Sequence, residues 1–574
     1  MLISSRILRG GVALGIALGT SLIAAPEAHA CGGLFCSSPQ LPVSQRAERI
    51  VFSRDDAGNV TAIVEIQYEG PAQEFAWLLP VAGSPEVGVS STAALQRLQA
   101  ATNPSYFMQT VFEGQCSDSF RGGPTFGGAV DASASASDAG ASRDGGSPVT
   151  VVSAGAVGPY DYVVISVDPA ASPRSEVAFQ WLMDNGYYVQ SAGAALYEPY
   201  LEGGMNLLAF RLTKGNDVGS IRPVRIGFGN GLATVPIRPT AVAATDDMGM
   251  LIWVLGPSRA IPVNYRALEL NDALINWFNP SSTYDDVVSA AANQAGGQGF
   301  VTEFAGDAPP FANTIWQEFE DQPFTSVRAQ SWTGREGELL ATLLTYTGYG
   351  SLDGAADVLS AQLPLPDGVT TSDLLSCVSC YYPAGTADIA GFDPAAFLDA
   401  FEAQVIQPMR DTRDLFADAS DVTRFYTTMS ASEMTMDPSF DFNADLPDVS
   451  NVHTATRTIE CSPSVSQSEA PWRVALPSGA TVRGTGSSWP LDVTSGLPAN
   501  VRILRIGTSG TGDVVTDNTG RITDALAAHN HEIPPPRTAG GGGGCTASPG
   551  ATSSSAAALF AALGALFVAR RRRR

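Results

Sequence analysis

Histidine is almost absent from this chain, which has four in 574 residues. One lies in the N-terminal leader, so only His453, His529 and His531 remain for chemistry elsewhere. A Ser-His-Asp hydrolase would have to use His453, and no G-x-S-x-G turn accompanies it. P-loop and dinucleotide-binding glycine patterns are missing as well. The sequence therefore carries no catalytic signature, and no cofactor is predicted apart from a weak calcium candidate.

Positive charge is also scarce. Lys214 is the single lysine beside 32 arginines, whereas 57 residues are acidic, and the net charge is −24. Such an acidic chain repels nucleic acid and anionic membrane surfaces, and it lacks the basic patches that nucleic-acid binding requires. We therefore expect no nucleic-acid partner.

Long apolar runs are confined to the two ends, and the first predicts a secretory signal peptide over residues 1–30. Two arginines precede the apolar stretch 10–25, and Ala28 and Ala30 supply the small residues that signal peptidase needs at −3 and −1. Cleavage would leave Cys31 as the first residue of the mature chain. A cysteine at that position is also required for lipidation, but the preceding residues match a lipobox poorly, so ordinary cleavage is favoured.

The C-terminal segment 545–574 forms a second signal, with Cys545, a spacer, the apolar stretch 556–569 and a terminal arginine cluster. Fourteen helical residues span about 21 Å against about 30 Å of hydrocarbon, which makes a poor permanent anchor. The arrangement resembles the myxobacterial C-terminal sorting signal, which implies processing by a sorting protease and display at the cell surface. A plain single-pass membrane anchor is the alternative. The cluster comprises Arg570, Arg571, Arg572, Arg573 and Arg574.

Cysteine usage agrees with export, because an even number of cysteines in an exported chain favours disulfides. Local spacing suggests one bridge between Cys31 and Cys36 and another between Cys377 and Cys380. The remaining pair would join Cys116 to Cys461, although six cysteines allow fifteen connectivities. The six are Cys31, Cys36, Cys116, Cys377, Cys380 and Cys461.

Most of the mature chain shows strand patterns. Apolar and polar residues alternate over 60–68, which predicts a half-buried strand after a turn at 55–59. Many strands and few helices indicate an α+β fold, built mainly on antiparallel sheet, with a mixed C-terminal region. Further strands are expected at 49–54, 75–79, 162–167, 206–212, 224–228, 235–243, 251–255, 261–264, 472–476, 481–484 and 501–506.

Capping residues predict the helices. Ser91 precedes a helix over 92–101, and Ser172 as N-cap with Pro173 at the first position begins a second helix. Others are expected at 336–345 and after Asp393, the latter ending or kinking at Gln407-Pro408.

Composition divides the mature chain into regions. Residues 31–314 form the α+β domain, interrupted by a Gly/Ala/Ser/Asp-rich insertion at 122–147 that we expect to be disordered. Residues 315–529 form a mixed second region, either a separate small domain or an extension that completes the first. A Pro/Gly linker follows at 530–544.

Four strings carry a family resemblance: EFAWLLPVAGSPEVGVS, VGPYDYVVIS, WLMDNGYYV and MGMLIWVLGPSRAIPVNY. Together with the opening CGGLFC, they resemble the bacterial domain-of-unknown-function family 2330 over about 31–345. These are core and turn strings, and the family implies no activity, ligand or site residue.

One acidic stretch offers a metal candidate. Asp441, Asn443 and Asp445 place oxygen ligands at EF-hand-like offsets, as calcium requires. The pattern then fails, because Leu446 replaces the loop glycine and Val452 the bidentate glutamate. A capped acidic loop is therefore favoured over a calcium site.

The other metal patterns are weaker. The CxxC of Cys377 and Cys380 precedes a Tyr-Tyr-Pro turn in a loop-like context, whereas a thioredoxin-like site begins a helix after a strand. A four-thiolate zinc site with Cys31 and Cys36 is less favoured than disulfides in an oxidising compartment. His529-x-His531 would bind a metal weakly from the linker.

These features predict an exported protein of the Gram-negative cell envelope, held at the membrane or displayed on the outer surface. Its partners would be signal peptidase, a C-terminal sorting protease and the membrane itself. We expect a binding or structural role with an unknown ligand. The alternatives are a carboxylate-based envelope enzyme acting on glycans or peptides, and a calcium-dependent adhesion module.

Overall fold

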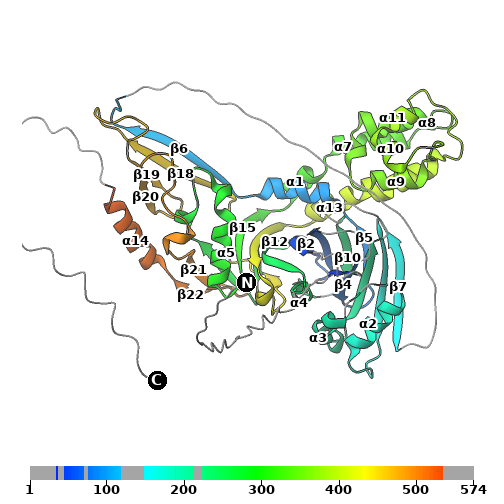
Figure 1. Ribbon diagram of the computed structural model, residues 1–574, viewed down its shortest axis with the longest axis horizontal. Helices are drawn as coiled ribbons and strands as arrows, with labels where there is room; N and C mark the ends of the chain where they lie inside the picture. Colours follow the sequence, from blue (N-terminus) through cyan, green and yellow to red (C-terminus); the bar gives the residue numbers. More distant parts are fainter. Residues whose placement is uncertain are drawn as a thin grey trace, which may run out of the picture.

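The computed structural model combines four mixed or antiparallel sheets with many helices, which confirms the α+β class (Figure 1). The predicted signal peptide, the insertion at 122–147 and the C-terminal segment 545–574 lie outside the described residues. The structure describes residues 34–36, 44–69, 75–117, 148–212 except 188 and 190, and 222–533 except 230.

A ten-stranded mixed sheet forms the centre of the molecule. Its middle strand contains the apolar run MLIWVL, whose residues are buried on both faces, as expected of a strand covered on both sides. The strand order is β22 (Asp513–Asp517), β21 (Asn500–Arg505), β14 (Arg266–Leu270), β15 (Gly299–Asp307), β16 (Asp421–Met429), β12 (Ala244–Gly256), β2 (Ser44–Arg54), β3 (Val60–Glu69), β10 (Val224–Phe228) and β5 (Glu86–Val89).

The sheet crosses the domain boundary that we expected near residue 315. Strand β16 pairs antiparallel with both β12 and β15, and β21 pairs with β14. Strands from before and after residue 315 therefore share one sheet. Composition could not show this, because the pairing joins strands more than 100 residues apart.

Two smaller sheets cover the β5 end and one face of the central sheet. A five-stranded sheet packs Trp77 and Phe210 against Ile66 and Ile226 of the central sheet. The three-stranded sheet lies over the face that carries Ile252. Their strands are β1 (Leu34–Cys36), β4 (Phe75–Val81), β9 (Asn206–Leu212), β8 (Tyr160–Val167) and β7 (Val149–Val157) in the first, and β11 (Ala233–Thr234), β17 (Ser439–Phe442) and β13 (Ala260–Pro262) in the second.

Helices 309–418 form a block on the opposite face of the central sheet, together with α1 (Thr92–Thr102). Here Val51 and Trp253 of the sheet pack against Ile315 and Phe401 of the block. The few helices predicted from sequence underestimate this region. Its helices are α6 (Pro309–Ile315), α7 (Glu318–Arg328), α8 (Glu336–Ala341), α9 (Ala355–Gln362), α10 (Thr371–Ser376), α11 (Val378–Tyr381), α12 (Pro394–Phe401) and α13 (Gln407–Asp418).

A buried arginine explains how the chain passes Pro408, where we expected a helix end or kink. Proline has no N–H to donate to the carbonyl of Gln404, and the helix makes a π-helical turn at Glu402–Ile406 before α13. The guanidinium of Arg222 donates to that carbonyl and to the carbonyl of Ser90. Burial lowers the pKa of Arg222 to about 10, so it stays charged at neutral pH.

Two predicted helix caps show when the local sequence is enough to identify the capping residue. The Ser91 hydroxyl accepts from the N–H of Ala93, as predicted for α1. Ser172 was predicted to cap the next helix, α2 (Arg174–Asp184), which is wrong. The carboxylate of Glu198, in α3 (Glu198–Glu202), accepts from the first two N–H groups of α2 instead. A tertiary contact therefore replaces the local cap.

The strand expected at 235–243 is also wrong. The chain forms β11 and then the short helix α4 (Ile237–Thr240). Pro236 and Pro239 lack N–H groups and cannot donate to a strand ladder. The apolar pattern was real, because Val235 and Ile237 are buried, but it belongs to a turn packed on the core.

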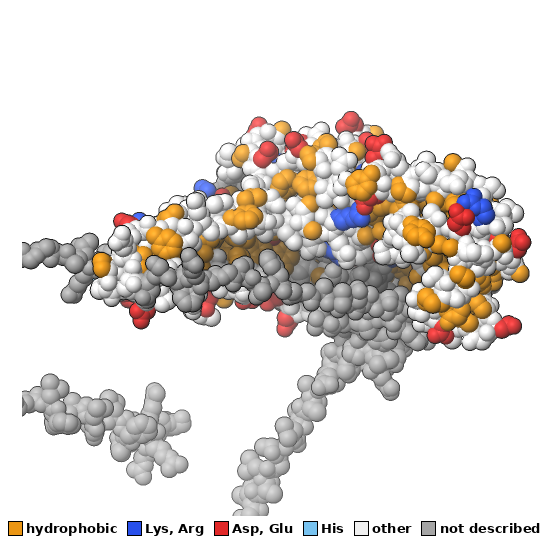
Figure 2. Space-filling model, turned by 90° about the horizontal axis from the view of Figure 1, so that it is seen from above, with side chains coloured by type: hydrophobic (Ala, Val, Ile, Leu, Met, Phe, Trp, Pro, Cys, Tyr) orange, Lys and Arg blue, Asp and Glu red, His pale blue; other side chains and the backbone are white. Residues whose placement is uncertain are grey.

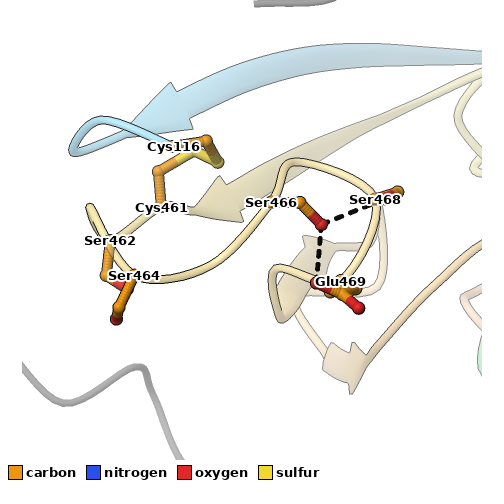
Figure 3. Close-up of a disulfide and its surroundings, with 7 residues drawn as sticks. All are labelled: Cys116, Cys461, Ser462, Ser464, Ser466, Ser468 and Glu469. Atoms are coloured by element: carbon orange, nitrogen blue, oxygen red, sulfur yellow. Dashed lines mark hydrogen bonds between the residues drawn. A yellow bond between two sulfur atoms is a disulfide. The ribbon is translucent and has the colours of Figure 1, made fainter. Parts of the chain in front are cut away.

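The fourth sheet projects from the centre and carries the long-range disulfide (Figures 1 and 3). Cys116 and Cys461 join the ends of the parallel strands β6 and β18 across 345 residues of sequence. Cys377 and Cys380 form a second disulfide, so disulfide-bonded cysteines are present as expected. Cys31 lies outside the described residues. The sheet comprises β20 (Thr481–Gly484), β19 (Trp472–Ala475), β18 (Val452–Glu460) and β6 (Ser105–Glu113), packed on α5 (Tyr284–Gln294) and α14 (Thr519–His531).

The same sheet contains a buried carboxylate held by two arginines. Arg473 and Arg483 both donate to Glu460, at 2.5 Å and 2.9 Å to Oε1. Burial would raise the pKa of Glu460, but the hydrogen bonds from the two guanidinium groups outweigh it and hold the pKa below its usual range. The ionised carboxylate therefore stabilises the folded state.

Glu460→Gln should lower the free energy of unfolding at neutral pH by about 1–3 kcal/mol, since the charge-assisted hydrogen bonds from the two arginines weaken. A depressed folded-state pKa contributes stability above the unfolded value of about 4.3, and that contribution is lost as pH falls through the folded value. Urea unfolding of both proteins from neutral to acidic pH should show the difference shrinking at acidic pH. A pH-independent difference would contradict this.

No helix within the described ranges has the length and hydropathy to cross a membrane. The apolar stretch 556–569 lies outside those ranges. On the face shown in Figure 2, acidic side chains are scattered and no extended basic patch is visible.

Candidate functional site

The candidate site lies on the helix-covered face of the central sheet, where that cover ends. Successive rows of side chains run across the strands on this face. In the first row, Arg424, Trp253 and Val51 are buried beneath α1 and the helical block. The next row carries Tyr426, Leu251, Arg49 and Glu65 in register across four strands.

The third row creates space because its central residues are small. Gly249 and Ala47 are paired there, with Gln67 beside them on β3. A cleft of about 360 Å³ opens above them, within the range of roughly 300–1,000 Å³ of small-molecule sites. The C-terminal end of α1 lines one wall, with Gln99 and Asn103, and the N-terminal end of α5 lines another.

A β-bulge directs a buried carboxylate into this cleft. The register between β15 and β16 skips Glu303, so this residue is the extra one in its strand. Bulges commonly redirect a side chain beside a functional site. Arg424 Nε donates to Glu303 Oε2 at 2.6 Å, and the Tyr284 hydroxyl donates to Oε1 at 2.5 Å.

Arg424 connects this carboxylate to the end of α1. Its Nη1 donates to the Gln99 carbonyl and to the Thr102 hydroxyl at 2.9 Å, and its Nη2 donates to the Asn103 amide oxygen at 2.8 Å. The guanidinium lies 5.6 Å from the ring centre of Trp253. A cation at a helix C-terminus also interacts favourably with the helix dipole. Burial raises the pKa of Glu303, and the charge of Arg424 opposes that rise.

A second ion pair borders the cleft. Arg49 Nε lies 2.5 Å from Glu65 Oε2, and both side chains are buried. Thr92 donates to the other Glu65 oxygen, while Arg49 Nη1 donates to the Gln99 amide oxygen at 3.0 Å. Burial raises the pKa of Glu65 despite the charge of Arg49. The two ion pairs fix the sheet to α1 from both sides.

Three tyrosines supply most of the aromatic lining. Tyr284 and Tyr426 stack with ring centres 6.4 Å apart, and the Tyr426 hydroxyl donates to Asp285 at 3.3 Å. Tyr106 packs edge-on against Trp277 and stacks on His453 at 4.8 Å. Burial raises the pKa of all three phenols, so they are neutral hydroxyls at physiological pH.

This arrangement suits recognition better than acid–base catalysis. Glu303 and Asp285 both line the cleft, as a pair of catalytic carboxylates would. Glu303, however, already accepts from Arg424 and Tyr284, and its side chain is only 1% exposed. It positions other side chains, while Asp285 at the exposed N-terminal turn of α5 can meet a ligand.

The three residues of the calcium candidate already have ionic or hydrogen-bond partners within the protein. Asp441 pairs with Arg54 at 3.0 Å. The Asn443 amide donates to the carbonyls of Gly507 and Gly510, and Asp445 accepts from the N–H of Gly510. These contacts hold the acidic loop against Arg54 and the segment 507–510. Within the described ranges, no group of three or more acidic, cysteine or histidine side chains is placed to hold a metal ion.

The three described histidines lie on two different elements. His453 is on β18, half-buried against Tyr106, and burial lowers its pKa. His529 and His531 were assigned to the linker, which is wrong, because they end helix α14 and His529 contacts the Arg483 carbonyl at 2.9 Å. Their helix packs on the fourth sheet, where Ile522 and Leu526 are buried.

The CxxC also differs from its predicted context. Cys377 immediately precedes the four-residue helix α11 and Cys380 lies within it, so the motif begins a short helix directly after α10 and does not lie in an open loop. The element directly before the motif is helix α10, whereas a thioredoxin-like motif begins a helix after a strand.

The residues of the cleft were not predicted from the sequence. The available signal was a single charged side chain within an otherwise uncharged strand segment, as in VTAIVEIQ for Glu65, GFVTEFAG for Glu303 and VTRFYTT for Arg424. Charged residues are rarely buried unless they are paired, so each implied a partner elsewhere. The pairing itself spans 121 residues for Arg424 and Glu303.

Comparison with known proteins places the chain in a family without assigning an activity. The family model described as an uncharacterized protein conserved in bacteria, DUF2330, matches residues 25–320. Searches of curated proteins and of solved structures returned no match. The match includes Glu303 and Asp285, whereas Arg424 and Tyr426 follow it. Because the match covers more than half of the chain, this protein belongs to the bacterial family DUF2330.

Proposed function

We propose that this protein is an exported envelope protein that binds a small ligand in the cleft between α1 and α5. The observation that carries the proposal is the cleft of about 360 Å³ on the central sheet, lined by Tyr106, Tyr284 and Tyr426. Concave sites with aromatic walls and a few oriented polar groups are typical of ligand binding.

The ion pairs around the cleft support this proposal. Glu303 with Arg424 and Glu65 with Arg49 neutralise each other, so their charges are compensated before any ligand arrives. Buried pairs of this kind contribute little net stability, and they are retained where they fix a specific arrangement. Here they orient the amides of α1 that line the cleft.

Filling the cleft provides the test of binding. Ala47→Phe would place a ring over the small third row, whereas Ala475→Phe adds the same ring at an exposed position on β19. Thermal unfolding should be measured with sugars, amino acids, nucleosides, organic acids and amines. We expect at least one compound to raise the melting temperature of the native protein and of Ala475→Phe, but not of Ala47→Phe. If no compound does so, the proposal fails.

Export rests on the two terminal signals and the disulfide-bonded cysteines. Mass spectrometry of the protein from a Gram-negative host should show a mature chain beginning at Cys31 with both described disulfides formed. An intact chain retaining Met1 and carrying free thiols would contradict export, without bearing on the cleft.

A further inference from the structure

The hydrogen-bonding groups of the cleft specify the chemistry of its ligand, and this inference rests on the binding role proposed above. On the α1 wall, the amide oxygens of Gln99 and Asn103 accept from Arg49 and Arg424. A guanidinium has donors only, so each amide must direct its oxygen to the arginine and keep its NH₂ as the free end. Neither NH₂ has a partner among the described residues. This wall therefore offers donors.

The wall formed by α5 has the opposite hydrogen-bonding character. The Tyr284 and Tyr426 hydroxyls donate to Glu303 and Asp285, which leaves the oxygen lone pairs of both phenols for a ligand. Asp285 is exposed, and no cation lies within 4 Å of it among the described residues. This wall therefore offers mainly acceptors, and a ligand must present acceptors to α1 and donors to α5.

A zwitterion such as an amino acid meets that pattern formally, but the helix ends oppose it. Its carboxylate would lie at the C-terminal end of α1, where the helix dipole is negative. Its ammonium would lie at the N-terminal end of α5, where the dipole is positive. Both nearby arginines are already paired with glutamates and cannot bind a second anion.

Neutral hydroxyl groups satisfy both walls, because each hydroxyl donates and accepts. The tyrosine rings offer apolar faces between the two polar walls, and a pyranose ring has an apolar C–H face to place on them. We infer that the cleft binds a neutral saccharide, with ring hydroxyls accepting from Gln99 and Asn103 and donating to Asp285. A cleft of about 360 Å³ admits a mono- or disaccharide unit of a glycan.

The test compares four classes of probe on the full-length mature protein by calorimetric titration. The neutral probes are maltose, cellobiose, lactose and N,N′-diacetylchitobiose; the others are spermidine as a cation, glucuronate and phosphate as anions, and glycylglycine as a zwitterion. We expect binding by at least one neutral disaccharide and by none of the charged probes. If a charged probe binds and Ala47→Phe abolishes its binding, the saccharide inference falls while the binding role survives. If no probe binds, the saccharide inference falls, and the compound survey with Ala47→Phe decides the binding role separately.

Isosteric variants test whether the named side chains of the two walls bind the saccharide. Gln99→Glu and Asn103→Asp keep an oxygen for each arginine but remove the NH₂ donor, so folding should persist, which urea unfolding checks. Asp285→Asn removes the charged acceptor. Each should weaken saccharide binding about tenfold, the loss expected for one good hydrogen bond. Gln362→Glu and Asp513→Asn make the same changes outside the cleft and should bind like the native protein. Undiminished binding by all three cleft variants would overturn the assignment.

Discussion

Replacing Cys116 and Cys461 with serine should lower the free energy of unfolding by about 5 kcal/mol, as expected for a cross-link that closes a very long loop. The bond spans 345 residues, so its loss frees most of the chain in the unfolded state. It also joins the exposed tips of β6 and β18, where residues such as Phe112 are only partly covered. Urea unfolding followed by far-UV circular dichroism measures the change.

The second disulfide provides a matched control. Cys377→Ser with Cys380→Ser opens a ring of only four residues, for which the same chain-entropy relation gives about 2 kcal/mol. The native protein in a reducing agent should approach the stability of a variant lacking all four cysteines. Equal effects of the two serine pairs would show that loop length does not determine the loss.

Arg424→Met should lower the free energy of unfolding by about 3–5 kcal/mol, since it leaves the buried Glu303 without its cation. Glu303 is 1% exposed and Arg424 is 4% exposed, so water cannot replace the lost partner. The variant also removes the donors to Thr102 and Asn103, which tie the sheet to α1. Denaturant unfolding at neutral pH measures the loss.

An exposed ion pair in the same sheet serves as a control, because it shares the charge pairing of Arg424 and Glu303 but not their burial. Arg502 and Glu269 form a two-point contact at 2.7 Å and 3.0 Å, with both side chains more than a third exposed. Arg502→Met should therefore cost at most about 1 kcal/mol. Adding Glu303→Leu to Arg424→Met should recover part of the stability, because no buried charge then lacks a partner. The account fails if the two arginine variants lose equal stability.

Local sequence patterns correctly predicted those helices and strands that are determined by residues close to them in the sequence. Alternation over 60–68 identifies β3, and Ser91 caps α1 through a hydrogen bond to a residue two positions away. The helix at Arg174 lost its predicted cap because the carboxylate comes from Glu198, 24 residues later. The apolar run at 235–243 was misassigned because its prolines outweigh its strand propensity.

The cleft could not be predicted for a related reason. Glu303 enters it through a one-residue register shift, which depends on the partner strand β16 and leaves no trace in the local pattern. Gly249 and Ala47 are ordinary strand residues until register places them together beneath a gap between two helices. The sequence shows each buried charge as a single charged residue in a strand. Its partner could be identified only from the pairing of strands that are distant in the sequence.

The insertion of β16 between β12 and β15 also sets an order of events for a chain that emerges from its N-terminus. When only the first 314 residues are available, β12 and β15 each have an unpaired edge, 13 and 9 residues long. Open edges of that length are templates for aggregation. The central sheet is therefore completed only when residues 421–429 are available to pair with both edges.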